Sequence, residues 1–169
     1  KKYSECLQYI EQVKAIPNLP EYNSGEIAYY KGMSNYYTNN KTAAITDLKN
    51  VSNNNDNLQA AESQYILAKI YFDNKDYKNS EKAALDYTAK FPAYEYYLGK
   101  TYILLSDIYV VQGNLLQAKA TLESVVENYS KEDDVMQEAK AKLQAVIDKE
   151  KGNSNLKLPN NSDMLQFDN

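Results

Sequence analysis

The sequence predicts an all-α protein, an α-solenoid made of about eight helices in stacked hairpins. The chain of 169 residues contains only 5 Gly and 4 Pro, which favours long helices over a turn-rich β protein. Its apolar residues recur with the period of a helix, and one pattern of small and large residues returns at a nearly constant spacing. Together these observations indicate helical hairpins that repeat along the chain.

The first predicted helix covers residues 2–14 and ends before Pro17 and Pro20. Its single apolar face consists of Tyr3, Cys6, Leu7, Ile10 and Val13. The later helices are separated by polar segments such as 39–41, 52–57 and 112–114. They are predicted over residues 21–37, 42–51, 58–72, 77–91, 94–111, 115–129 and 134–149.

The two ends of the sequence differ from its middle. The chain starts with Lys1 inside a helical pattern, and we therefore expect it to be cut from a longer protein. Residues 152–169 lack a helical period and are rich in Asn, Ser and Asp, which predicts a non-helical tail. One hypothesis is that its stretches 156–159 and 163–167 lie in a binding groove. The apolar residues that could dock are Leu156, Leu158, Leu165 and Phe167.

Alignment of residues 60–92 with the segments on either side shows a repeat. The middle unit holds its key side chains at Ala68, Tyr71, Tyr77, Ser80, Ala84 and Tyr87. The same positions hold Gly32, Asn35, Lys41, Ala44, Leu48 and Val51 in the preceding unit, and Ser106, Tyr109, Leu115, Ala118, Leu122 and Val125 in the following unit. The first and fourth positions are always Gly, Ala or Ser, and helices that cross closely need such small side chains.

This order of small and aromatic residues, closed by Pro92, resembles the tetratricopeptide repeat (TPR) over about residues 1–150. The resemblance implies a right-handed superhelix. The expected domains are a solenoid over 1–151 (half repeat 1–18, repeats 21–57, 58–93 and 94–130, and a final or capping helix 133–150) and the tail 152–169. The spacing and the AKFP sequence are similar to bacterial cell-envelope and Bacteroides-type TPR proteins. Asn35 and Lys41 replace the family's aromatic residues, so the first full unit is the least typical.

Composition argues against several classes of function. The net charge is −4 with both signs interspersed, which disfavours nucleic acid and anionic membranes as partners, and no apolar run is long enough for a membrane span. With no His and a single Cys, zinc binding and Cys–His catalysis are not expected, and we predict no cofactor, metal or catalytic residue. Cys6 is read as a small buried hydrophobe and the acidic run 132–134 as a helix N-terminus, capped by Asp133 or Asp134.

The resemblance also implies a binding groove, because TPR superhelices generally bind peptides on the concave face formed by the first helix of each unit. The equivalent residues are Tyr29, Met33, Tyr36, Tyr37, Tyr65, Lys69, Phe72, Asp73, Ile103, Asp107, Val110 and Val111. Their aromatic stripes predict an apolar groove with hydroxyl rims. The alternative is that the rings pack against the neighbouring unit or the tail. Tyr29 and Met33 stand where carboxylate-binding TPR domains have Lys and Asn, which disfavours that mode.

The resulting hypothesis is a non-enzymatic protein–protein interaction scaffold that binds a peptide or protein in its concave groove, within a bacterial envelope assembly. One alternative is a homo-oligomerisation module that associates through the exposed N-terminal half repeat. The other is a ligand-binding or carbohydrate-active helical-repeat domain, which would need a deep pocket with converging carboxylates. The resemblance favours the periplasm or the envelope, and the cytoplasm stays an open alternative.

Overall fold

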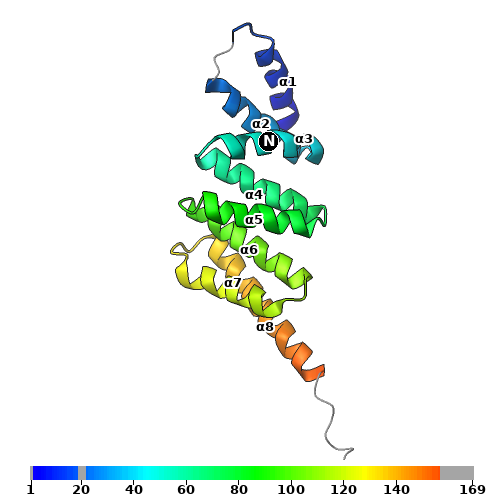
Figure 1. Cartoon of the computed structure of the whole chain (residues 1–169), viewed down its shortest axis with the longest axis vertical. Coiled ribbons are helices and arrows are strands. Elements are labelled where there is room, and N and C mark those ends of the chain that lie inside the picture. Colours follow the sequence, from blue (N-terminus) through cyan, green and yellow to red (C-terminus); the bar gives the residue numbers. More distant parts are fainter. Residues whose placement is uncertain (1, 19–21, 157–169) are drawn as a thin grey trace, which may run out of the picture.

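The computed structural model of the chain describes residues 2–18 and 22–156 and places eight helices in them. In chain order these are α1 (Tyr3–Lys14), α2 (Tyr22–Tyr37), α3 (Lys41–Asn54), α4 (Leu58–Asp73), α5 (Tyr77–Lys90), α6 (Glu95–Val111), α7 (Leu115–Asn128) and α8 (Asp134–Leu156). Figure 1 shows them stacked along the long axis of the molecule, with α1 at one end and α8 at the other. The predicted all-α solenoid is confirmed.

The helices form two layers. Successive helices pack as hairpins (α2–α3, α4–α5 and α6–α7), and each hairpin packs on the next one. The first helices α2, α4, α6 and α8 also contact one another in that order, whereas α1, α3, α5 and α7 make no such contacts among the described residues. The first helices therefore lie closer to one another than the second helices do. We call them the inner layer and the others the outer layer.

Each hairpin turns through one residue with a left-handed backbone conformation, at the same position of the repeat. The φ angle is 63° at Asn39, 61° at Lys75 and 80° at Gly113. In all three turns, the following amide donates a hydrogen bond of 2.8 to 2.9 Å to a carbonyl in the last turn of the first helix. These bonds run from Asn40 to Asn35, from Asp76 to Tyr71 and from Asn114 to Tyr109. The three hairpins therefore share one turn geometry at the same position of the repeat.

The small residues predicted at the helix crossings lie where the helices approach closely. A Cβ atom added to Gly32 would lie 2.8 Å from Cδ2 of Leu48, so α2 and α3 leave no room for a side chain there. In the next hairpin the Ser80 hydroxyl donates to the Ala68 carbonyl at 2.8 Å, and both residues are fully buried. The structure therefore confirms the physical reason for the repeat pattern at these two crossings.

Two helices extend beyond their predicted ends into polar sequence. α3 continues to Asn54, inside the predicted loop 52–57, and the Asn54 side chain donates to the Asn50 carbonyl at 2.9 Å. α8 continues to Leu156, so the prediction of a non-helical tail from residue 152 onward is wrong for its first residues. The remainder of the tail lies outside the described residues, and its docking in a groove stays a prediction.

Among the described residues, the core consists of three clusters of buried side chains, each shared by helices of both layers. One joins α4 to α8, one joins α2 to α4, and one joins α3, α4 and α5. Tyr65 of α4 packs against all three clusters. Among the described residues, no helix is both long enough and apolar enough to cross a lipid bilayer.

Candidate interaction surface

The residues predicted to form a groove all lie on inner-layer helices. α2 carries Tyr29, Met33, Tyr36 and Tyr37, α4 carries Tyr65, Lys69, Phe72 and Asp73, and α6 carries Ile103, Asp107, Val110 and Val111. Met33 and Ile103 are only 8% and 2% exposed, so they belong to the core and cannot contact a partner directly. The prediction that these two residues form part of a groove surface is therefore wrong.

Tyr29 and Tyr65 pack between successive inner helices. The Tyr29 hydroxyl donates to the carboxylate of Glu62 on α4 at 2.5 Å, and Tyr97 on α6 also hydrogen-bonds Glu62. Burial raises the pKa of Tyr29 and Tyr97 well above the ordinary value, and the bond to the Glu62 carboxylate adds to both shifts. The Tyr65 ring lies 5.7 Å from that of Tyr97, centroid to centroid. One carboxylate thus links three inner helices.

At the other end of α2, Tyr36 and Tyr37 make an edge-to-face pair with 5.1 Å between ring centroids. Tyr37 stacks on Tyr3 of α1 at 4.3 Å, while 48% of Tyr37 is exposed. Tyr36 is half-buried against the core and lies near Asp73 of α4. Burial, with a smaller contribution from the negative charge of Asp73, raises the pKa of Tyr36. Tyr36 therefore keeps a partly exposed edge beside a carboxylate.

The last turns of α4 combine an aromatic ring with an ion pair. Phe72 is half-buried and packs edge-to-face on Tyr77, with 5.5 Å between ring centroids. Lys69 pairs with Asp73 at 3.3 Å, and the two side chains remain 38% and 32% exposed. We call Tyr29, Tyr36, Tyr65 and Phe72 the aromatic half of the inner face.

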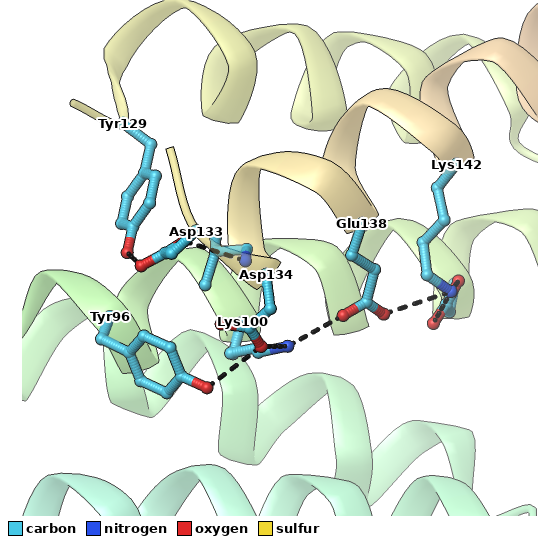
Figure 2. Close-up of polar contacts among 9 residues, drawn as sticks. Tyr96, Lys100, Tyr129, Asp133, Asp134, Glu138 and Lys142 are labelled. Carbon is cyan, nitrogen blue, oxygen red and sulfur yellow. Dashed lines mark hydrogen bonds and ion pairs between the residues drawn. The ribbon is translucent and has the colours of Figure 1, made fainter. Parts of the chain in front are cut away.

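Ion pairs between α6 and α8 form the other part of the inner face, which Figure 2 shows in close-up. Lys142 of α8 pairs with Asp107 of α6 at 2.7 Å and lies 3.8 Å from Glu138. Glu138 in turn accepts from Lys100 of α6 at 3.0 Å. We call Lys100, Asp107, Glu138 and Lys142 the charged half of the inner face. Its side chains form a continuous chain of alternating charge.

The first turn of α8 extends this network. Lys100 also pairs with Asp134 at 2.7 Å, and Asp134 accepts from the Tyr96 hydroxyl at 3.2 Å. The neighbouring Asp133 accepts from the Val135 amide at 3.0 Å, which confirms Asp133 as the side chain that caps α8. It also accepts from the Tyr129 hydroxyl at 2.7 Å. The acidic run before α8 therefore caps and anchors a helix, as expected.

In the charged half, burial and hydrogen bonding shift the pKa values in opposite directions. Burial alone would lower the pKa of Lys100, but its hydrogen bonds to Asp134 and Glu138 outweigh burial and raise the pKa. The hydrogen bond from Lys100 lowers the pKa of Asp134. For Asp107 the loss of hydration on burial outweighs the pairing with Lys142, so the pKa of this carboxyl is raised. Lys100, whose side chain is 16% exposed, is the centre of the network.

Several residues that join the inner helices were absent from the prediction: Glu62, Tyr97, Lys100, Glu138 and Lys142. A signal for two of them was present, because Glu62 and Lys100 occupy the same position of consecutive units, six residues before Ala68 and Ser106. That position lies one turn before Tyr65 and Ile103 on the same helix face. Assigning this repeat position to the inner face, together with the other groove positions, would have predicted charged residues there.

The carbohydrate-active alternative requires a pocket with converging carboxylates. A hollow of about 370 Å³ between α6 and α7 has Glu95 as its single lining carboxylate. Glycoside hydrolysis ordinarily uses a pair of carboxyl groups. Among the described residues, no group of three or more acidic, Cys or His side chains could hold a metal ion.

Comparison with known proteins agrees with this architecture. Residues 93–132, which include α6 and α7, match the family model of the tetratricopeptide repeat. No curated protein matches the sequence. Among solved structures, the crystal structure of BtubC (BKLC) from P. vanneervenii is similar, with a TM-score of 0.62 and 16% identity over 98% of this chain and 79% of that chain. At this identity the likeness concerns the fold. The match to the repeat covers residues 93–132, and the stacked hairpins around it have the architecture of a helical-repeat protein.

Proposed function

We propose that the protein is a non-enzymatic scaffold that binds a peptide or protein partner on its inner face. TPR-type repeats suggest protein–protein interaction, and arrays of this kind offer a continuous surface made by successive first helices. The observation that carries the proposal is a stripe of incompletely covered side chains across α2, α4, α6 and α8. It consists of Tyr36, Lys69, Phe72, Asp73, Asp107, Val110 and Lys142.

The chemistry of the stripe suggests the chemistry of its partner. Tyr36 and Phe72 are half-buried, so each ring is held by the core and still offers a face to a ligand. Rigid rings of this kind give large contact area at low cost in side-chain entropy. The pairs Lys69–Asp73 and Asp107–Lys142 are about one-third exposed and can exchange partners with a bound chain. We therefore propose a segment with an apolar anchor beside both charged and hydrogen-bonding groups.

The proposed setting is a bacterial envelope assembly, in which the array presents one partner to others. This part of the proposal rests on the resemblance of the spacing and the AKFP sequence to envelope TPR proteins. Fractionation of the source cells, followed by detection of the protein in the envelope and soluble fractions, tests it. Recovery in the cytoplasmic fraction alone contradicts the envelope setting. It does not contradict the proposed binding surface.

Affinity capture from an extract of the source cells tests the binding surface. The bait proteins are the wild type, the double variant Tyr36→Ala/Phe72→Ala and the control Leu116→Ala. Leu116 lies on the outer helix α7 and is 76% exposed. A partner of the inner face is captured by the wild type and the control. It is lost from the double variant, because removal of one central aromatic anchor costs about 2 kcal/mol, roughly 30-fold in affinity.

Two measurements make the capture decisive. Circular dichroism at 222 nm verifies that the double variant keeps its helical content, so that loss of binding is not loss of fold. The dissociation constant of the captured partner is then measured by calorimetry with all three proteins. Equal affinities for the wild type and the double variant contradict the inner-face proposal.

A further inference from the structure

The hollow between α6 and α7 is lined by four parts of the chain. They are the link from α5 to α6, the first half of α6, the last turns of α7 and the start of the link to α8. The hairpin that forms the hollow lies between α5 and α8 in the stack, away from both ends of the array (Figure 1). A volume of about 370 Å³ is in the range of small-molecule sites. Its lining includes Pro92, Glu95, Leu98, Val125, Asn128 and Tyr129.

The repeat register shows that an aromatic ring stands at the equivalent place in the preceding hairpin. Val125 of α7 corresponds to Tyr87 of α5, whose ring is 0% exposed. In the α6–α7 hairpin this ring is absent, and the neighbouring side chains of Leu98 and Tyr129 remain partly exposed. They do so although Leu98 is larger than Ala60, its equivalent in α4. Apolar surface is therefore left accessible where the α4–α5 hairpin has a packed ring.

A cation is also present in the preceding hairpin and absent here. The Lys90 ammonium of α5 donates to the Ser52 carbonyl and, at 3.3 Å, to the Asn53 carbonyl, both in the last turn of α3. α7 has Asn128 at the position of Lys90, and its amide donates to the Ser124 carbonyl of its own helix at 2.8 Å. The lysine bridge from one outer helix to the next is thus not repeated between α5 and α7.

The groups around the hollow favour a positive charge in it. Glu95 is the single charged residue of the lining. It pairs with Lys131 at 3.6 Å, but both side chains are more than half exposed, so the carboxylate can change its partner. α5 ends at Lys90, two residues before Pro92, and a helix carries partial negative charge at its C-terminal end. Pro92 has no N–H with which to bond the Thr88 carbonyl of that last turn.

We propose that the hollow between α6 and α7 binds a small organic ligand in which an aromatic ring is joined to a positively charged amine. The ring would pack over Val125, where the preceding hairpin has Tyr87. The ammonium would take the place of Lys90, with Glu95 as its counter-ion. The hollow shares no residue with the inner-face stripe, and the proposal does not depend on that stripe.

Two other occupants fit this hollow less well. Residues 157–169 of the chain contain one aromatic ring, Phe167, and its neighbour Asp168 would bring a second carboxylate toward Glu95. A segment of a partner protein would place backbone amide and carbonyl groups against Leu98 and Val125, and each group left without a hydrogen bond costs free energy. A compact ring with one ammonium avoids both costs.

Titration of the full chain, labelled with ¹⁵N, tests the proposal with phenethylamine as the probe. The matched controls are 2-phenylethanol, which has the ring without the charge, and butylamine, which has the charge without the ring. Chemical-shift changes at the amides of Gly99, Asn128 and Tyr129 measure binding. Phenethylamine is expected to bind at least about tenfold more tightly than either control, the ratio that ~1.4 kcal/mol gives. Equal affinity for phenethylamine and 2-phenylethanol overturns the proposal, as does the absence of shifts at these amides.

Variants at exposed positions separate charge from shape, with circular dichroism to verify the fold. Glu95→Gln is expected to weaken phenethylamine about tenfold and to leave 2-phenylethanol unchanged. Asn128→Lys restores the lysine of the preceding hairpin and is expected to weaken phenethylamine as well. The control Glu127→Gln, an exposed residue of α7 outside the lining, should keep the wild-type affinity. Equal effects of the two glutamate variants overturn the proposal. So does tighter binding of a peptide with the sequence of residues 87–90, because the hollow would then suit a partner chain.

Discussion

The aromatic half and the charged half of the inner face join successive helices at equivalent repeat positions but by different chemistry. Glu62 accepts hydrogen bonds from Tyr29 and Tyr97, so rings and hydroxyl groups link the helices there. At the equivalent position of the next unit, Lys100 lies between two carboxylates. The register therefore determines where neighbouring repeats touch. Residue identity determines how the contact responds to salt and pH, and how much ring surface stays accessible to a partner.

The largest effect is expected from Tyr65→Ala in the aromatic half. Tyr65 packs against all three core clusters, and removal of a ring of this size from a packed site costs about 3 kcal/mol. Urea unfolding followed at 222 nm measures the loss, with Leu116→Ala on the exposed outer face as a control that stays within about 0.5 kcal/mol of the wild type. A loss below about 1 kcal/mol for Tyr65→Ala would show that the ring is not a packing residue.

A smaller loss is expected from Lys100→Met in the charged half, about 1–2 kcal/mol, because Asp134 and Glu138 lose the cation between them. Salt separates the two halves: at about 1 M NaCl, where charges are screened within ~3 Å, the cost of Lys100→Met shrinks and that of Tyr65→Ala does not. The same unfolding experiment at two salt concentrations measures both. An unchanged cost of Lys100→Met at high salt argues that the Lys100 stem, not its charge, stabilises the contact.

Tyr29→Phe keeps the ring and removes the hydroxyl, and we expect a loss of about 1 kcal/mol at neutral pH. The pKa of Tyr29 is raised above its ordinary value of 10.0, so the folded protein keeps this proton at pH values where the unfolded chain releases it. Stability from this group is therefore present below about pH 10 and falls as the pH rises further. The variant should lose less stability than the wild type between pH 9 and pH 11. A parallel decline of the two proteins contradicts the assignment.

The smallest effect is expected from Asp134→Asn, no more than about 0.5 kcal/mol, because this side chain is largely exposed. The lowered pKa of Asp134 means that its contribution is present above its ordinary pKa of 3.8 and is lost as the pH falls. The difference between wild type and variant should therefore disappear on acidification. Asp107→Asn is the matched control with the opposite sign: the raised pKa of Asp107 favours the folded state in acid, so its removal steepens the acid decline.

Most of the architecture followed from the sequence because the signals are local. Polar turns, amphipathic periods and small residues at the crossings predicted every helix among the described residues. At Gly32 the physical reason for the small residue is visible, because Leu48 of α3 leaves no space for a side chain. The ends of α3 and α8 were missed because Asn, Ser and Gly are weak helix formers, so helix extension there was not expected. At the end of α3, the Asn54 side chain bonds back to the Asn50 carbonyl.

The inner face was predicted less completely, since the register gives positions but not partners. Tyr29 and Tyr65 were placed on the correct helices, yet whether a ring faces a partner or a neighbouring helix depends on residues such as Glu62 and Tyr97, far away in the sequence. The same holds for the pairing of Asp107 with Lys142. Cys6 shows a related effect: it stands at a core position, but it lines a hollow because no described helix covers α1 there.

Site-specific photo-crosslinking tests the central claim, that the aromatic half meets the partner, most directly. A benzoylphenylalanine is introduced at position 36 on the inner face or at position 116 on the outer face, and the partner found by capture is added before irradiation. We expect a crosslinked complex from position 36 and none from position 116. Crosslinking from position 116 alone would contradict it, because the partner would then lie on the outer layer.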